Sequence, residues 1–199
     1  MTPAATEKGE GTRQRLIEVA ARHFADHGYA GTSLNDLVRL SGLTKGAFYF
    51  HFPSKERLAL DVIKVKREQW RRDVIAAAAE QERASQQLAA IVRVLAGLKE
   101  RDPSAAAIGR LCRELADLPE LRSQVSHFEA WIETTARLLE QARAEGDLDL
   151  DVDVEAAARF AVAAYCGAEQ IADLQGRTLS EGVEDLLAFI LRAVGLRLD

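Results

Sequence analysis

Apolar residues recur at helical spacing along nearly the whole chain, and this periodicity restricts the possible folds more than any other feature. In the first such segment one stripe is formed by Leu16, Ile17, Ala20, Ala21 and Phe24. This is the spacing of a buried helix face. No alternating pattern typical of a β-strand lasts beyond a few residues. The sequence therefore predicts an all-α protein of about nine helices.

Glycine, proline and hydroxyl residues mark the boundaries of these helices. Gly28 can end the first helix, and Ser33 and Asp36 have the spacing of a capping box at the start of the second. Thr44 can cap the third helix, which Pro53 stops. The predicted helices cover about 12–27, 34–40, 44–50, 54–79, 86–100, 104–115, 123–145, 154–174 and 180–194.

The composition is that of an ordinary globular protein. Hydrophobic residues make up 48% of the 199 residues and charged residues 29%, which excludes a disordered chain. No apolar run approaches the roughly 20 residues of a membrane span, so we expect no membrane association. The first residues, MTPAATEKGEG, lack the apolar segment of a signal peptide. We expect residues 1–10 to form a disordered tail.

Two cysteines, Cys112 and Cys166, lie in apolar helical patterns without CxxC spacing. Buried free thiols in a reducing compartment are the favoured interpretation, and a structural pair is the alternative. The predicted location is therefore the cytoplasm.

Charge is divided unevenly along the chain, although the net charge is only −5. Residues 1–75 contain 13 Lys and Arg against 9 Asp and Glu, whereas residues 76–199 contain 13 against 22. A basic N-terminal part on an acidic body would orient towards a polyphosphate through the basic part alone. The asymmetry is consistent with nucleic acid as a partner.

The stretch from Thr32 to Lys55 predicts how such a partner is bound. It reads as two short helices joined by a tight turn at Ser41-Gly42, with a helix before them. Such a helix-turn-helix unit can place its second helix in the major groove of DNA. That helix combines basic, hydroxyl and very small residues, which permit close approach to bases and phosphates. The predicted DNA-binding residues are Thr32, Ser33, Thr44, Lys45, Gly46, Tyr49, His51 and Lys55.

The aromatic run from Phe48 to Phe52 has a second interpretation, as a simple core cluster. We expect Phe48, Phe50 and Phe52 to be packing residues. Five consecutive aromatic residues cannot all face inward on a helix, so Tyr49 or His51 should be exposed. For His51, DNA contact and packing are equally compatible with the sequence.

Residues 11–58 resemble the DNA-binding domain of TetR-family transcriptional repressors. The matching segments are FADHGYAGTSLNDLV and SGLTKGAFYFHFPSKERL. The resemblance implies a homodimer that binds a palindromic operator in double-stranded DNA and releases it when a small molecule enters the body. It places Thr44, Lys45, Gly46 and Tyr49 on the recognition helix and makes Lys55 a phosphate-binding residue. It also implies a DNA-binding domain over residues 11–57 and a ligand-binding and dimerisation domain over residues 58–199.

The helix predicted over residues 123–145 mixes aromatic and polar residues on one stripe, as the wall of a ligand pocket does. A buried core helix is the alternative. From Gly109 onward the chain resembles the γ-butyrolactone-receptor branch of the family, in segments such as FEAWIETTARLLEQARAEGDLDLD. That resemblance implies a small hydrophobic ligand held against Trp131. The predicted ligand-binding residues are Trp131, Gln124, Phe128, Thr135 and Tyr165.

The last two predicted helices are apolar on more than one face, so one face should pack on the body and another on a second copy of the chain. Small residues in these helices allow close approach. The alternative is that both helices are buried within a monomer. The predicted dimer-interface residues are Phe160, Ala164, Ala168, Leu187, Ile190 and Leu191.

An enzyme is the main rival class, and the sequence offers it no catalytic residues. GxSxG, P-loop and GxGxxG motifs are missing. His23 and His27 have a spacing usable for zinc, but the glutamate of an HExxH motif and a third ligand are lacking. We therefore expect no catalysis, metal or cofactor. The ligand, the operator sequence and the sign of regulation are left open, so an activator or a receptor for an antibiotic, furan or lipid is the alternative.

Overall fold

The computed structural model describes residues 3–118, 121 and 128–197, and this part of the chain is helical apart from its connections. Its single β-bridge, between Leu148 and Leu196, is isolated. The chain forms two compact units. The first contains residues 1–68 and 102–126, and the second contains residues 69–101 and 127–199. The all-α prediction is confirmed.

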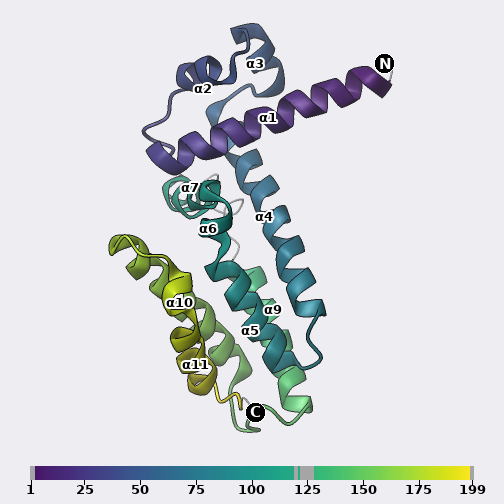
Figure 1. Cartoon of the computed structure of the whole chain (residues 1–199), viewed down its shortest axis with the longest axis vertical. Helices are drawn as coiled ribbons and strands as arrows, with labels where there is room; N and C mark the ends of the chain where they lie inside the picture. The colour runs from purple at the N-terminus through teal and green to yellow at the C-terminus, as the bar shows by residue number, and fades with distance from the viewer. Residues whose placement is uncertain (1–2, 119–120, 122–127, 198–199) are drawn as a thin grey trace. The chain divides into compact units, whose positions relative to one another are not determined.

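In the first unit, three N-terminal helices are followed by the beginning of a long fourth helix and by a later segment of the chain (Figure 1). The elements are α1 (Pro3–His27), α2 (Leu34–Ser41), α3 (Lys45–His51), the first part of α4 (Lys55–Ala79), the 3-10 turn η1 (Pro103–Ala105) and α7 (Ala106–Ala116). α1 packs against α2, η1 and α7. The segment after residue 102 therefore supports the N-terminal helices from outside their own sequence.

The core of the first unit follows the predicted stripe. All five apolar residues of the α1 stripe are buried, and Phe24 is fully inaccessible. They meet apolar residues of the other helices in this unit. The largest fully buried side chains of the unit are Phe24, Phe48, Phe52, Ile17, Leu37, Leu58, Ile63, Ile108, Leu111, Leu115 and Val62. Burial of such side chains stabilises a domain by about 1.5–3 kcal/mol each.

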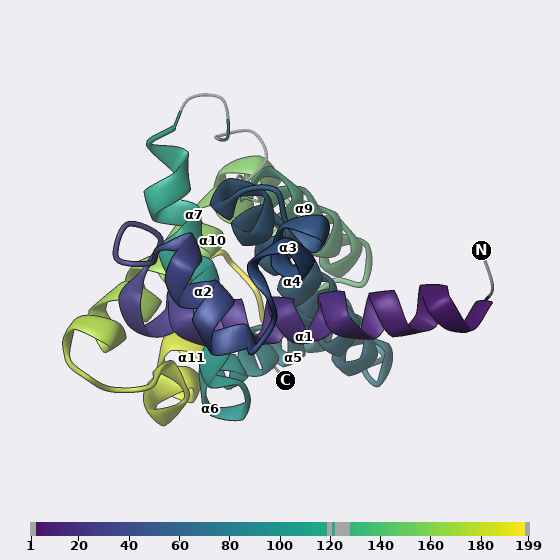
Figure 2. The same ribbon diagram turned by 90° about the horizontal axis from the view of Figure 1, so that it is seen from above.

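α1 begins at Pro3, where the sequence predicted a disordered tail up to residue 10 and a helix start near Thr12. Proline is tolerated at a first helical position because its missing N–H would have no helical partner there. Ala4, Ala5 and Glu7 are good helix formers, and a helix already nucleated by its core-facing turns extends at low cost. The first turns of α1 extend past α2 and α3 in both views (Figures 1 and 2).

The second unit is built from helices that lie side by side (Figure 1). Its elements after α4 are α5 (Ala84–Ala96), α6 (Leu98–Arg101), α9 (Phe128–Ala144), α10 (Val154–Leu174), the 3-10 turn η2 (Leu179–Gly182) and α11 (Val183–Ala193). The helix predicted over residues 86–100 is divided into two because Gly97 caps the end of α5. Residues 123–127 of the helix predicted over 123–145 lie outside the described part of the chain.

An apolar cluster fills the second unit, with contributions from α5, α9, α10 and α11 and from Leu148 and Leu196 beside them. Two polar residues, Asp147 and Ser85, are buried next to it. Asp147 is 6% exposed and accepts a hydrogen bond of 2.8 Å from the Ser85 hydroxyl. It also pairs with the Arg83 guanidinium. These bonds tie the end of α9 to the start of α5.

Cys112 and Cys166 are free thiols and partly buried, as predicted. Burial raises the pKa of both thiols. None of the helices in the described residues is long and apolar enough to cross a membrane.

Candidate functional site

The turn between α2 and α3 is defined by local hydrogen bonds that the sequence predicted. Ser33 caps α2, with its hydroxyl accepting from the Asp36 amide and the Asp36 carboxylate accepting from the Ser33 amide. Gly42 ends α2 with a φ of 68°, a left-handed conformation that favours glycine. Thr44 caps α3 by accepting from the Ala47 amide. The direction of α3 relative to α2 is therefore fixed by backbone chemistry.

One face of α3 is fixed in the core. Phe48 is 1% exposed and Phe52, just after the helix, is 0% exposed, so both are packing residues as predicted. On another face Tyr49 is 38% exposed, and the Lys45 ammonium lies 5.9 Å from the centre of its ring. Gly46 is exposed, and a Cβ added there would meet nothing within 4 Å. The helix thus presents a cation, a phenol and an uncovered backbone to solvent.

Phe50 was predicted as a packing residue, and the structure shows this to be wrong. Its side chain is 85% exposed. The reason is geometric, since consecutive residues of an α-helix are rotated by about 100°, which places Phe50 about 160° from Phe48. Its ring meets the half-buried His51 edge-on at 5.3 Å.

Three of the residues predicted to contact DNA use their polar atoms for hydrogen bonds within the first unit. The Lys55 ammonium donates to the Tyr29 and Thr32 carbonyls at 2.9 and 2.8 Å and lies 4.0 Å from the Tyr29 ring centre. Thr32 is 2% exposed, and its hydroxyl donates to the Gly28 carbonyl at 2.7 Å. Ser33 is engaged in its cap. These groups shape the connection from α1 to α2.

The segment from residue 102 onward supports the same connection, a role that the sequence analysis missed. Glu114 of α7 accepts a hydrogen bond of 2.8 Å from the Ala30 amide. Arg110 donates to the Asp26 carbonyl at 3.1 Å and to the Glu114 carboxylate at 3.1 Å. Gly28 has a φ of 71°, which favours glycine, and an added Cβ would lie 2.4 Å from the Glu114 carboxylate, so that side chain would have to move.

Two buried charges of α4 were also missed. Lys66 is 3% exposed, and its ammonium lies 3.0 Å from Glu18 of α1 and 2.8 Å from Asp102. Asp61 is 5% exposed and pairs with Arg13 of α1 at 2.5 Å. Asp61 also pairs with the nearby Arg57 at 3.3 Å. Nothing in the sequence pattern shows that these charges are buried, because Arg13, Glu18 and Asp102 lie 36 to 48 residues away from them.

His23 and His27 stack, with ring centroids 4.2 Å apart. Burial lowers the pKa of His23, and the neighbouring His27 lowers it further. In the described part of the chain, no three His, Cys, Asp or Glu side chains gather in a way that could hold a metal ion.

In the second unit, Trp131 and Tyr165 meet edge-on, with ring centroids 6.2 Å apart and an interplanar angle of 68°. Tyr165 is 6% exposed, and its burial raises its pKa. Trp131 and Thr135 are half-buried, whereas Phe128 is 46% exposed. Gln124 lies outside the described residues. The structure therefore brings together two of the five predicted ligand-binding residues.

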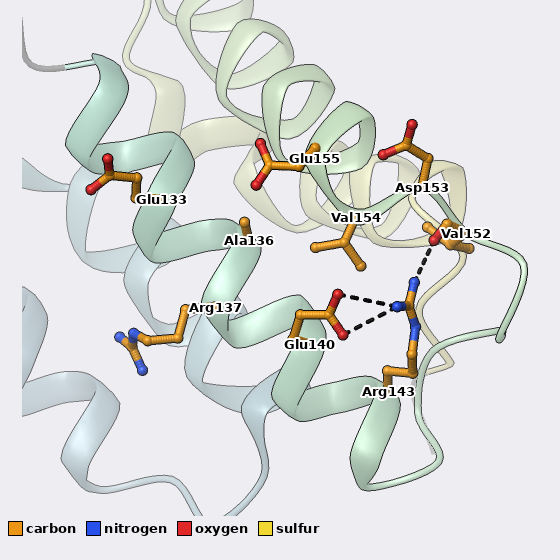
Figure 3. Close-up of a pocket in the computed structure, with 9 residues that line it drawn as sticks. All are labelled: Glu133, Ala136, Arg137, Glu140, Arg143, Val152, Asp153, Val154 and Glu155. Atoms are coloured by element: carbon orange, nitrogen blue, oxygen red, sulfur yellow. Dashed lines mark hydrogen bonds and ion pairs between the residues drawn. The ribbon is translucent and has the colours of Figure 1, made fainter.

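A pocket of about 500 Å³ lies between α9 and the start of α10 (Figure 3). Charged side chains surround its small apolar floor, and the Arg143 guanidinium bridges Glu140 and the Val152 carbonyl at one end. The lining residues are Glu133, Ala136, Arg137, Glu140, Arg143, Val152, Asp153, Val154 and Glu155. None of the predicted ligand-binding residues that the structure describes lines this pocket, and its charges do not suit a hydrophobic ligand.

The predicted dimer residues fall into two groups. Leu187, Ile190 and Leu191 are 2 to 6% exposed because this face of α11 packs into its own unit. They leave little surface for a partner, which corrects their assignment. Phe160 is 50% exposed, and Ala164 and Ala168 are half-buried. The exposed apolar surface on these helices is completed by residues outside the prediction: Ile171, Leu174 and Phe189, at 57, 82 and 74% exposure.

Comparison with known proteins gives the first unit a family. Residues 16–62 match the model of the bacterial regulatory proteins of the tetR family. The A-factor receptor protein of Streptomyces griseus is 28% identical over 176 residues, which cover 83% of this chain and 59% of that protein. The alignments with this receptor and with a probable acrEF/envCD operon repressor of Escherichia coli cover 59% and 21% of those proteins.

Solved structures extend the likeness to the whole chain. Full-length TylP, a TetR regulator from Streptomyces fradiae, is 31% identical with a TM-score of 0.71, and the match covers 98% of this chain and 89% of that one. A γ-butyrolactone receptor described as ArpA-like is 27% identical with a TM-score of 0.69, over 94% and 99% of the two chains. The matching proteins named here are receptors and regulators, in line with the expectation that the chain is not an enzyme. The chain belongs to the tetR family of bacterial regulatory proteins.

Proposed function

We propose that the protein is a dimeric transcriptional repressor that binds operator DNA through α3 and releases it when a small hydrophobic molecule binds the second unit. The observation that carries the DNA-binding part is the exposed face of α3. Lys45 and Tyr49 project from a helix whose inner face is fixed by Phe48 and Phe52. A helix held in this way can enter a major groove without losing order.

The charge around α3 supports this use. Residues 28–57 contain four Lys and Arg against two Asp and Glu. Lys45 makes no ion pair within the described part of the chain, so its ammonium is available to a phosphate or a guanine edge. Thr44, Gly46 and Tyr49 lie beside it. Thr32, Ser33 and Lys55 would contribute mainly by holding the preceding connection in shape.

The test is a gel-shift titration with the DNA upstream of the protein's own gene. We expect the wild type to shift this DNA at low salt and to lose affinity steeply as salt rises. The Lys45→Ala and Tyr49→Ala variants should each bind about tenfold more weakly. Lys64→Ala, an exposed lysine of α4, is the matched control and should bind like the wild type. A wild-type protein that fails to shift the DNA at low salt would remove the proposal.

For the ligand, the likeness to a γ-butyrolactone receptor and to the A-factor receptor supports a molecule of that class. The Trp131–Tyr165 contact supplies an aromatic, mostly apolar surface with one phenol, which suits a small hydrophobic molecule with a polar group. A different hydrophobic ligand, or activation in place of repression, is the alternative. Release of operator DNA by a γ-butyrolactone should be lost in Trp131→Ala, whereas unchanged release would exclude Trp131 from the site.

Release would follow from a population shift. α4 is one continuous helix of 25 residues and belongs to the first unit at its start and to the second at its end. A ligand that changes the packing around the second half of α4 would alter the distance between the two DNA-binding first units of a dimer. Half-sites on one DNA face lie about 34–36 Å apart per helical turn, so a displacement of a few ångströms breaks the match. Spin labels on the two first units of a dimer measure this distance. If the distance is the same with and without ligand, the mechanism is contradicted.

A further inference from the structure

Phe50 is a large apolar side chain in an unusual place. Its 85% exposure equals that of Leu150, a loop residue, and exceeds that of the other large apolar residues that the structure describes. The residues three and four positions before it, Ala47 and Gly46, lie next to it on the helix surface and carry almost no side chain. The ring therefore lies on the side of α3 that faces away from the core, with the His51 ring edge-on to it at 5.3 Å.

The neighbours of Phe50 argue against a protein partner. Exposed apolar patches that bind proteins are broad and continuous. Here the ring has Tyr49 on one side and His51 on the other, and the cationic Lys45 lies on the same helix. A single large apolar group beside small and polar side chains on an exposed helix face matches the major groove, where thymine presents one methyl group among hydrogen-bonding base edges.

We propose that Phe50 packs against the C5-methyl group of a thymine and thereby determines part of the operator sequence. This inference rests on the proposed DNA-binding function and names a residue that selects the sequence. A phenyl ring offers no hydrogen bond, so it favours thymine over cytosine at one position by apolar contact alone. Ala47 and Gly46 leave the space through which the base edge approaches.

Replacement of thymidine by deoxyuridine in the DNA tests the contact directly, because it removes the methyl group of the base and leaves base pairing unchanged. The upstream DNA fragment is prepared with thymidine or with deoxyuridine at every such position. The dissociation constant of the protein is then measured for each fragment. Burial of one carbon is worth a factor of about four. With one contact from each protomer, we expect the wild type to bind the deoxyuridine fragment about fifteenfold more weakly. Phe50→Ala should bind the two fragments with nearly equal affinity, and Phe50→Leu should lie between.

The matched control is Leu150→Ala, which removes an equally exposed side chain from the second unit and should keep the wild-type ratio. A Phe50→Ala variant that retains the wild-type ratio overturns the proposal, since another residue would then contact the methyl groups. A wild type that binds both fragments with equal affinity also overturns the proposal. This holds even if Phe50→Ala weakens binding to both fragments, because that result would indicate a ring inserted between base pairs and not a contact with a methyl group. A wild type that binds neither fragment at low salt removes the DNA-binding function itself.

Discussion

Different interactions stabilise the interior of each of the two units. In the first unit, buried charges link helices that are far apart in sequence, and Lys66 and Asp61 of α4 are 3% and 5% exposed. In the second unit, alanine, leucine and valine side chains make most of the core, with one buried carboxylate at Asp147. Apolar contact is not directional, whereas a buried ion pair is satisfied in only one arrangement.

The charges between α1 and α4 show what this difference achieves. Arg13 pairs with Asp61 and Glu18 pairs with Lys66, so the positive residue is on α1 in one pair and on α4 in the other. Sliding the helices past each other would bring like charges together. The ion pairs thus permit one register of α1 against α4. A unit that binds DNA needs such a fixed arrangement of its helices. The second unit leaves apolar side chains exposed on α10 and α11, a surface that can accept a second copy.

The largest effect is expected at that surface. Phe189→Asp should raise the dissociation constant of the dimer about a thousandfold. Each of two symmetry-related phenyl rings would lose about 2 kcal/mol of burial, and about 4 kcal/mol corresponds to this factor. Sedimentation equilibrium across nanomolar to micromolar concentrations measures the change. Leu150→Asp, at a site more exposed than Phe189, is the control and should leave the dimer intact.

This prediction can fail in two ways that carry different lessons. A wild type that sediments as a monomer at micromolar concentration would show that the apolar surface serves something other than dimerisation. A dimer that survives Phe189→Asp unchanged would place the interface elsewhere, for example around Phe160 and Leu174 without α11.

The second effect concerns the first unit. Lys66→Met should lower the free energy of unfolding by about 1 to 2 kcal/mol, because it removes the charge-assisted hydrogen bonds to Glu18 and Asp102, whose carboxylates are 33 and 36% exposed and can still be hydrated. Lys64→Met on the exposed side of the same helix is the matched control, with an effect within about 0.5 kcal/mol. Urea denaturation gives both values. Equal stability of the two variants would show that the buried pairs do not hold the register.

Sequence reasoning located the helices well where capping chemistry is local. Ser33, Gly42 and Thr44 act at the ends of α2 and α3 as predicted. Phe50 shows where it failed, because the residues of the aromatic run assigned to the core were spaced by two, whereas an α-helix repeats every 3.6 residues. Phe48 and Phe52, four apart, share the inner face, and Phe50 falls opposite. The correct period would have exposed it.

Other features depend on packing between distant segments and could not be predicted. α11 has two apolar faces, and only the fold shows that Leu187 and Leu191 belong to the unit's own core while Phe189 does not. Lys66 is buried because Glu18 and Asp102 converge on it from sites 48 and 36 residues away. A single sequence has no signal for such convergence.

The smallest effect tests whether the buried charges act through ionisation. Burial alone would raise the pKa of Asp102, but hydrogen bonds from Lys66 and from Ser104 outweigh it and hold this pKa below its usual value. A carboxyl whose pKa is lowered on folding stabilises the protein above its unfolded pKa of about 3.9, and this contribution is lost as the pH falls through the folded value.

Asp102→Asn should therefore reduce the difference in unfolding free energy between pH 6 and pH 3. The reduction should stay below about 1 kcal/mol, because the Asp102 side chain is 36% exposed and solvent screens it. The exposed Asp117→Asn serves as control and should leave the wild-type pH dependence unchanged. If Asp102→Asn leaves the pH dependence of stability unchanged, the Asp102 carboxylate does not act as the counter-ion of Lys66. The buried ion pairs that distinguish the first unit would then be those of Asp61 with Arg13 and of Lys66 with Glu18.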